Sequence, residues 1–245
     1  MHRDGSQRTP QPDCVEPVGF AVMKQEWCEL AYIHFDYDPG VVQALLPPGL
    51  EVDTWEGRAW VGLIPFSMRG ISFPFTPAVP WLGSFPEINV RTYVIRNGVP
   101  GVWFFSLDVN RLLPAFVARL TYRLPYCWGR ASNSRVGDRL VTEVDRRWPA
   151  AEATARIEVS IGETITEPTA FEHFLTARWG LYSSAGRGRL RYAPVDHPRW
   201  ELRRASVVNL KETLFAAAGL PAPTGEAHCM YSAGVPVRIG LPRRA

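Results

Sequence analysis

The sequence predicts an α+β fold built around a large antiparallel β-sheet. Segments of strand-like character recur along most of the chain, whereas helical spacing is confined to a few short segments. The regular strand–helix–strand order of a parallel sheet is missing from the pattern. Tight-turn signals at Glu56-Gly57 and Asn97-Gly98 each lie between two strand-like segments and predict β-hairpins.

The predicted strands follow one another with few interruptions. The two hairpins occupy residues 51–66 and 88–109. We expect a loop from Phe73 to Pro86, because this stretch is too rich in proline for a central strand. The other predicted strands are residues 28–37, 127–134, 139–147, 153–161, 179–183, 190–196, 201–208 and 228–240.

Short helices are expected wherever a capping signal precedes helical spacing. The expected helices are residues 39–46 between the cap Asp38 and Pro47, 111–121 after the cap Asn110, 170–178 after the capping box from Thr169 to Glu172, and 210–218 between the cap Asn209 and Gly219.

The composition excludes several classes of partner. The chain has 245 residues and a formal net charge of +3, and its basic residues are spread out instead of forming a stripe. A nucleic-acid interface is therefore not predicted. No apolar run approaches the roughly 20 residues that a membrane-spanning helix needs. We expect a soluble, cytoplasmic protein without nucleic-acid or membrane partners.

The cysteines and the N-terminal segment agree with that location. Cys14, Cys28, Cys127 and Cys229 are far apart and form no CxxC pair, which is typical of reduced thiols. The polar N-terminal segment lacks the apolar region of a signal peptide. We expect residues 1–18 to be a disordered leader and residues 19–245 to form a single domain.

Neither a metal site nor a nucleotide cofactor is predicted. The histidines are isolated, and His228 and Cys229 would point to opposite faces of a strand. The GxSxG motif of a serine nucleophile and the GxGxxG motif of a dinucleotide site are both missing. Cys127, between two aromatic residues, is most simply a small buried apolar residue.

Charged residues within apolar sequence are the stronger signal. Glu87, Asn89 and Arg91 share one face of the strand FPEINVRTYV. Glu87 and Arg91 would lie about 13 Å apart along this strand, so each needs a partner from another element. For Glu87, Arg119 or His34 would serve. The pattern alone favours an outer face of the sheet, and it favours a structural role for His34 and for His197.

Several segments together resemble a known family. They are YIHFDYDPGVVQALLPPGLEVDTWEGRAWVGLIPFSM, FPEINVRTYV, PGVWFFSLD, ARLTYRLPYCWG, FLTARWGLY and VDHPRWEL. In this order, from about residue 25 to 240, they resemble the YqjF-like bacterial proteins of unknown function. That family in turn is similar to the acetoacetate decarboxylase superfamily. The resemblance implies a mostly antiparallel sheet closed into a cone-like barrel, with three to four short helices, an apolar cavity and a homo-oligomeric assembly.

The resemblance also indicates where a site would lie. Acetoacetate decarboxylase forms a Schiff base through a lysine that follows a proline. In ARLTYRLPYCWG, Arg119 matches the conserved arginine of that segment, Pro125 matches the proline, and Tyr126 and Cys127 occupy the positions of its paired lysines. Glu87 resembles the cavity glutamate. On this comparison, the polar face of the strand around Glu87 becomes a wall of the cavity.

The missing lysine decides against the decarboxylase mechanism. An imine needs a primary amine, which neither tyrosine nor cysteine supplies. Lys24 and Lys211, the two lysines of the chain, lie outside the matching segment. The fold implied by the resemblance is therefore expected, and its reaction is not.

Two functions remain open. In the first, an enzyme without a cofactor acts on a small carbonyl-bearing or acidic metabolite by acid–base chemistry, such as proton transfer next to a carbonyl group, as an isomerase, dehydratase, cyclase or lyase does. In the second, the cavity binds an apolar ligand without chemistry. The candidate catalytic residues are Glu87, Tyr126 and Arg119, and the candidate substrate-binding residues are Arg91, His34, Asn89 and His197.

Overall fold

The computed structural model describes residues 11–79, 83–112, 123–149, 153–184, 186 and 188–245. The strands are β1 Ala21–Tyr37, β2 Glu51–Val52, β3 Thr54–Trp55, β4 Arg58–Ser72, β5 Phe85–Arg96, β6 Val99–Val109, β7 Tyr126–Val136, β8 Arg139–Trp148, β9 Ala153–Thr164, β10 Gly180–Ser184, β11 Leu190–Asp196, β12 Arg203–Glu212, β13 His228–Gly240 and β14 Arg243–Arg244. The helices among these residues are α1 Pro39–Gln43, α3 Ala170–Thr176 and α4 Leu214–Ala217.

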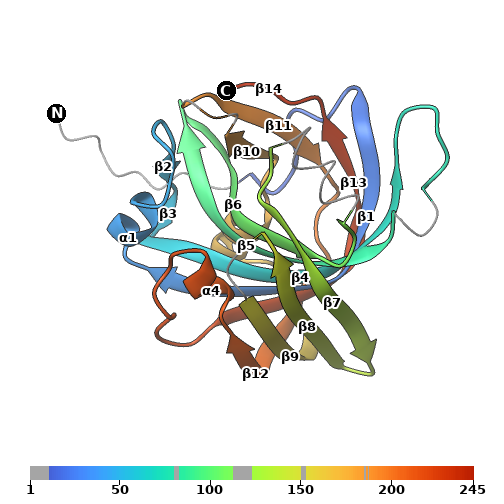
Figure 1. Ribbon diagram of the computed structural model, residues 1–245, viewed down its shortest axis with the longest axis vertical. Coiled ribbons are helices and arrows are strands. Elements are labelled where there is room, and N and C mark those ends of the chain that lie inside the picture. Colours follow the sequence, from blue (N-terminus) through green and yellow to red (C-terminus); the bar gives the residue numbers. More distant parts are fainter. Residues whose placement is uncertain (1–10, 80–82, 113–122, 150–152, 185, 187) are drawn as a thin grey trace.

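The strands close into two rings that share a wall. Strands β6, β5, β4, β1 and β13 are paired in this order and form the shared wall. On one side, β10 and β11 join β6 to β13 and complete the smaller ring. On the other side, β7, β8, β9 and β12 complete the larger ring. Figure 1 shows β10 and β11 above the shared strands, and β8, β9, β12 and α4 below them. The predicted barrel, mostly antiparallel with short helices, is confirmed.

Each side of the shared wall has its own hydrophobic core. Tyr32, Phe66 and Val109 belong to the core inside the smaller ring, which also includes residues of β10, β11 and α3. Ile33 and Ile88 belong to the core of the larger ring, together with residues of β8, β9 and α4. Successive side chains of a shared strand therefore enter different cores, and both faces of the strand are buried.

Bends let the long shared strands serve both rings. The register between β1 and β4 shifts between Cys28 and Ile33, and Glu29 has a positive φ of 53°. Opposite Cys28 on β13 lies Gly234, with a φ of 133°. A Cβ atom at Gly234 would lie 2.1 Å from the carbonyl oxygen of Trp27, so only glycine fits there. Irregularities of this kind bend strands at the corners of closed sheets.

Most local predictions are confirmed. The side chain of Asp38 accepts a hydrogen bond from the N–H of Gly40 and caps α1, which ends earlier than expected. The capping box of Thr169 and Glu172 is present at α3. The turns at Glu56-Gly57 and Asn97-Gly98 have positive φ at both residues, as the tight hairpin turns require. The helix expected at residues 111–121 lies largely outside the described residues.

The predicted helix start at Asn209 is wrong. Asn209 pairs with Glu158 of β9, and β12 continues to Glu212 before α4 begins. Pairing with β9 gives this segment strand hydrogen bonds, which outweigh a local capping preference. The N-cap of α4 is Thr213, and the side chain of Glu212 before it accepts from the N–H of Phe215. Gly219 follows the helix with a positive φ of 83°.

Candidate functional site

The polar residues of β5 face the interior of the smaller ring. Glu87 lies opposite Phe66 and Asn89 opposite Ile64, and both partners belong to the core of that ring. The exposed fractions of Glu87, Asn89 and Arg91 are 2%, 3% and 9%. The outer face that the pattern alone favoured is therefore wrong, because β5 belongs to both rings and has no face toward solvent.

Glu87 is a buried carboxyl group held by a tyrosine. Tyr126, at the start of β7, donates a hydrogen bond of 3.1 Å from its hydroxyl to Oε2 of Glu87. Burial raises the pKa of Glu87 to about 7, although the hydrogen bonds from Tyr126 and Asn89 act against this rise. The nearby Asp108 adds to it. A carboxyl group with a pKa near neutrality can both accept and return a proton, which is the property of a general acid–base catalyst.

Arg91 is a buried cation without a carboxylate partner among the described residues. Its terminal Nη2 lies 3.5 Å from the hydroxyl of Tyr93 and 3.4 Å from the carbonyl oxygen of Leu175, and its Nε has no hydrogen-bond partner in the described part of the chain. Its guanidinium carbon lies 5.6 Å from the ring centre of Tyr32 and 5.7 Å from that of Tyr93. By contrast, the buried Arg146 is bound to a carboxylate.

His34 belongs to a different hydrogen-bond chain from Glu87. Its Nε2 lies 2.6 Å from the hydroxyl of Tyr93, which donates over 2.6 Å to the carbonyl oxygen of Leu175. The hydroxyl proton of Tyr93 is donated to the carbonyl oxygen of Leu175, so in the contact between Tyr93 and His34 the donor is Nε2 of His34. Burial, with the nearby Arg91 and His228, holds the pKa of His34 well below its usual range, so the ring is neutral. The predicted pairing of His34 with Glu87 is wrong.

Three buried polar atoms of this region lack hydrogen-bond partners among the described residues. They are Oδ1 of Asn89, Nε of Arg91 and Nδ1 of His34. Gly62 lies between His34 and Arg91 in the strand register, and its lack of a side chain leaves room for the His34 ring. Buried polar groups of proteins are nearly always hydrogen-bonded, so these three orphan atoms suit the polar groups of a ligand.

The positions that match the decarboxylase lysines diverge in direction. The hydroxyl of Tyr126 donates to Glu87, whereas Cys127, the next residue of β7, lies opposite Asp108 of β6 in the strand register. Lys24 on β1 and Lys211 on β12 are both exposed, so neither amine is buried in the interior of the smaller ring. Arg119 lies outside the described residues.

His197 lies apart from Glu87, in a pocket of about 350 Å³. Its ring packs between Trp179 and Trp200, with centroid distances of 4.5 and 4.9 Å. Trp200 in turn contacts Tyr32, the ring beside Arg91. The structure thus gathers Glu87, Asn89 and Tyr126 at one point of the smaller ring and Arg91 with His34 at another.

The site residues predicted from the sequence do not include Tyr93 or Tyr32, which also belong to this region. Tyr93 follows Arg91 by two positions on the same face of β5, which is a signal that the alternation of the strand offered. Tyr32 precedes His34 by the same spacing on β1. Among the described residues, no three His, Cys, Asp or Glu side chains gather as metal ligands would.

Comparison with known proteins places the chain in a family. The model of the family DUF2071, an uncharacterized conserved protein, matches residues 24–236. The uncharacterized protein YqjF of Bacillus subtilis is 31% identical over 229 residues, which cover 93% of this chain and 94% of YqjF. The chain belongs to this family.

Solved structures share the fold. The enduracididine biosynthesis enzyme MppR, complexed with pyruvate, has a TM-score of 0.65 at 15% identity, covering 94% of this chain and 98% of MppR. Acetoacetate decarboxylase from Legionella pneumophila has a TM-score of 0.63 at 15% identity, covering 96% and 92%. An acetoacetate decarboxylase-like enzyme from Sphingomonas wittichii has a TM-score of 0.65 at 14% identity, covering 92% and 94%. The fold is therefore acetoacetate decarboxylase-like. No helix in the described ranges is long and apolar enough to cross a membrane.

Proposed function

We propose that the protein is an enzyme that transfers a proton next to the carbonyl group of a small carboxylic acid, inside the smaller ring. The observation that carries this proposal is Arg91. It is a buried guanidinium group without a carboxylate partner among the described residues, and it lies on the same inner face as Glu87. An unpaired buried charge is costly, and a bound anion would remove that cost.

Glu87 is the proton-transfer group in this proposal. Its pKa of about 7 keeps part of the population ionised at neutral pH, and this carboxylate removes a proton from the carbon next to the carbonyl group. Tyr126 holds the carboxylate in place through its hydrogen bond. Asn89 offers its free Oδ1 to a donor on the substrate. Arg119, a candidate catalytic residue from the sequence, binds the enolate oxygen in this proposal.

Arg91 anchors the substrate through its carboxylate. Arginine binds carboxylates with two parallel hydrogen bonds, and its Nε and one Nη suit that geometry. The Cα atoms of Glu87 and Arg91 are about 13 Å apart along β5. A substrate that contacts both side chains therefore has several bonds between its carboxylate and its reacting carbon. We accordingly propose that the substrate is a keto acid in which several bonds separate the carboxylate from the reacting carbon, and not one of the shortest keto acids.

MppR, complexed with pyruvate, supports this choice of substrate class by analogy of fold. A sequence identity of 15% supports a shared fold and does not support a shared reaction. Because both lysines of this chain are exposed, the reaction proceeds through proton transfer and not through an imine.

The test is the exchange of substrate hydrogen for deuterium. Wild-type protein in heavy water is incubated with pyruvate, acetoacetate and levulinate, in which the keto group lies progressively farther from the carboxylate. NMR then measures exchange next to the carbonyl above the spontaneous rate. We expect exchange with levulinate to be fastest, and Glu87→Gln to slow it at least about a hundredfold, the usual worth of a positioned acid–base group.

The alternative function is ligand binding without chemistry, and the apolar and aromatic core around the β5 face is the observation that favours it. The same experiment separates the two functions. Levulinate that binds, measured by calorimetry, but exchanges no faster than in buffer would identify a binding protein. Equal exchange rates for the wild type and Glu87→Gln would refute the role of Glu87.

A further inference from the structure

The pocket beside His197 is separate from the site around Glu87. Its volume is about 350 Å³, and its lining includes Pro12, Thr166, His173, Trp179, His197 and Trp200 but no residue of β5. This volume lies in the range of small-molecule sites. We propose that this pocket binds a planar aromatic molecule that carries an N–H donor and no negative charge. This inference does not depend on the proposed function.

The walls of the pocket suit a flat ring. His197 packs between Trp179 and Trp200, so three aromatic rings follow one another along one side of the pocket. Trp200 is fixed in place, because its Nε1 donates to the carbonyl oxygen of Thr176 and its ring stacks on Trp27. Rigid aromatic walls favour stacking or edge-on contact with an aromatic ligand.

His197 determines which polar group the ligand needs. Its exposed fraction is 6%, and its Nδ1 lies 2.8 Å from the carbonyl oxygen of Pro198. A carbonyl oxygen only accepts, so Nδ1 carries the proton and Nε2 of the neutral ring is an acceptor. Nε2 makes no hydrogen bond to another described residue and is not among the fully buried atoms, so it is accessible to a ligand. Burial lowers the pKa of His197 to about 4, which keeps the ring neutral. A ligand therefore satisfies Nε2 by donating to it.

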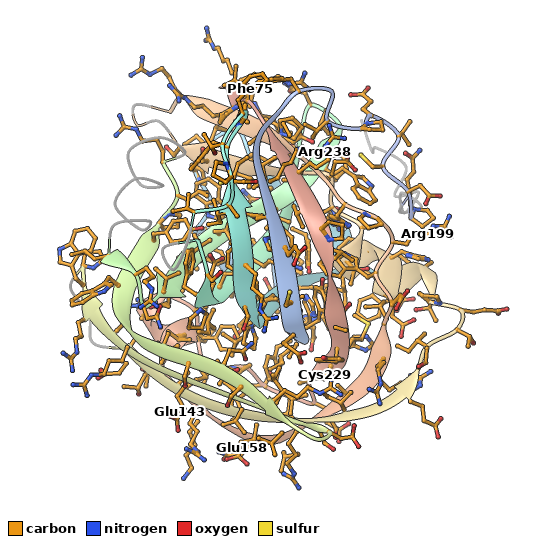
Figure 2. The ribbon with its side chains drawn as sticks, turned by 90° about the vertical axis from the view of Figure 1, so that its right-hand side faces the viewer. Phe75, Glu143, Glu158, Arg199, Cys229 and Arg238 are labelled. Atoms are coloured by element: carbon orange, nitrogen blue, oxygen red, sulfur yellow. The ribbon has the colours of Figure 1, made fainter. Side chains whose placement is uncertain are left out.

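The charges around the pocket disfavour an anion. Arg199 is paired with Asp13, and both side chains lie at the surface, where Figure 2 shows Arg199 at the outer edge of the molecule. Glu201 adds a carboxylate to the lining. Burial and Arg199 lower the pKa of His173, so this ring adds no positive charge near neutral pH. No positive charge in the described lining is thus left uncompensated, and a negative ligand would meet Glu201.

The test compares two probes that differ only in the donor. Indole has an aromatic N–H, and N-methylindole has the same ring without it. We expect calorimetry to show that wild-type protein binds indole about tenfold more tightly, the usual effect of one hydrogen bond at a buried site. In His197→Phe, which keeps a ring between the two tryptophans, this preference disappears. Indole-2-carboxylate, a ring that carries a negative charge, binds more weakly than indole.

A control variant tests whether the preference for indole depends on His197 in particular. His228→Phe removes a histidine outside the pocket lining and leaves the preference for indole unchanged. Equal affinity for indole and N-methylindole in the wild type would overturn the proposal, and so would a preference that survives in His197→Phe. An absence of any indole binding up to millimolar concentration would overturn it as well. If His197→Phe does not fold, the comparison of the two probes on the wild type decides.

Discussion

The hydroxyl of Tyr126 donates a hydrogen bond of 3.1 Å to Oε2 of Glu87 in the interior of the smaller ring. This hydrogen bond favours the ionised carboxylate, whereas burial favours the protonated form. Burial has the larger effect and raises the pKa of Glu87 from 4.5 to about 7. The protein therefore keeps, in an apolar core, a carboxyl group whose charge changes near neutral pH.

The raised pKa of Glu87 makes the stability of the protein depend on pH. The folded state holds the proton more tightly than the unfolded state, so the stabilising contribution is complete below about pH 4.5. It is lost as the pH rises to about 7. Glu87→Gln cannot ionise. Relative to the wild type, its free energy of unfolding should increase by about 3 kcal/mol between about pH 4.5 and pH 8. Urea unfolding at several pH values measures this difference.

An exposed control separates burial from the loss of a charge. Glu226→Gln removes a carboxylate from the surface, so its difference from the wild type should stay nearly constant over the same pH range. A Glu87→Gln variant that behaved like this control would contradict the buried setting of Glu87.

The two hydrogen bonds that link His34, Tyr93 and the carbonyl oxygen of Leu175 should stabilise the interior of the smaller ring. Tyr93→Phe removes the hydroxyl, which leaves Nε2 of His34 unpaired in the core and leaves the carbonyl oxygen of Leu175 with only the 3.4 Å contact to Nη2 of Arg91. We expect a loss of about 2 kcal/mol or more in the free energy of unfolding, measured by urea denaturation. A Cβ atom at Gly62 would lie 2.8 Å from Nε2 of His34, so Gly62→Ala should disturb the same chain and also destabilise. Two variants as stable as the wild type would argue against this network.

The ion pair of Asp108 and Arg146 is structural. Both side chains are buried, and the guanidinium binds the carboxylate through two hydrogen bonds of 2.6 and 2.7 Å. Arg146→Leu leaves Asp108 charged and unpaired, which should cost about 3–5 kcal/mol of stability in urea denaturation. The control is Arg156→Leu. Arg156 pairs with Glu143 and Glu158 on the outer surface, where Figure 2 shows both glutamates pointing outward, and its loss should cost less than about 1 kcal/mol. Similar losses in both variants would contradict this distinction.

Reduction with borohydride tests the absence of an imine. Lys24 and Lys211 are exposed and not buried in the interior of the smaller ring, so incubation with acetoacetate and borohydride should leave the intact mass unchanged. A lysine adduct of stoichiometric yield, located by peptide mass spectrometry, would show that the chemistry follows the decarboxylase after all.

Local features of the fold were predictable from the sequence, and long-range pairings were not. The turns at Glu56-Gly57 and Asn97-Gly98 have a conformational requirement that neighbouring residues alone express. The capping box at Thr169 is equally local. The helix predicted to start at Asn209 was wrong, because pairing with β9, which is distant in the sequence, favours a strand there over the helix that the local signal indicated. The second ring depends on pairings such as that of β11 with β13, for which no local signal exists.

The location of the site was predictable in part, and the family resemblance predicted it better than the alternation of side chains did. Alternation placed Glu87, Asn89 and Arg91 on one face, but it favours solvent for a polar face. Only the resemblance to a barrel family placed this face inside, where the structure has it. The contact of His34 with Tyr93 joins residues 59 positions apart. Such a contact follows from the pairing of β1 and β5 with the two edges of β4 and from no spacing in the sequence.

The most direct test of the account is whether Arg91 recognises a carboxylate. Calorimetry compares levulinate with levulinamide, its uncharged amide, on the wild type and on Arg91→Gln. We expect the wild type to prefer levulinate by about 2 kcal/mol, or roughly thirtyfold, because a buried guanidinium that has no carboxylate partner among the described residues gains one. In Arg91→Gln this preference should vanish while the amide binds as before. A wild type that binds both molecules equally, or an Arg91→Gln variant that keeps the preference, would contradict the proposal that this buried arginine holds the substrate.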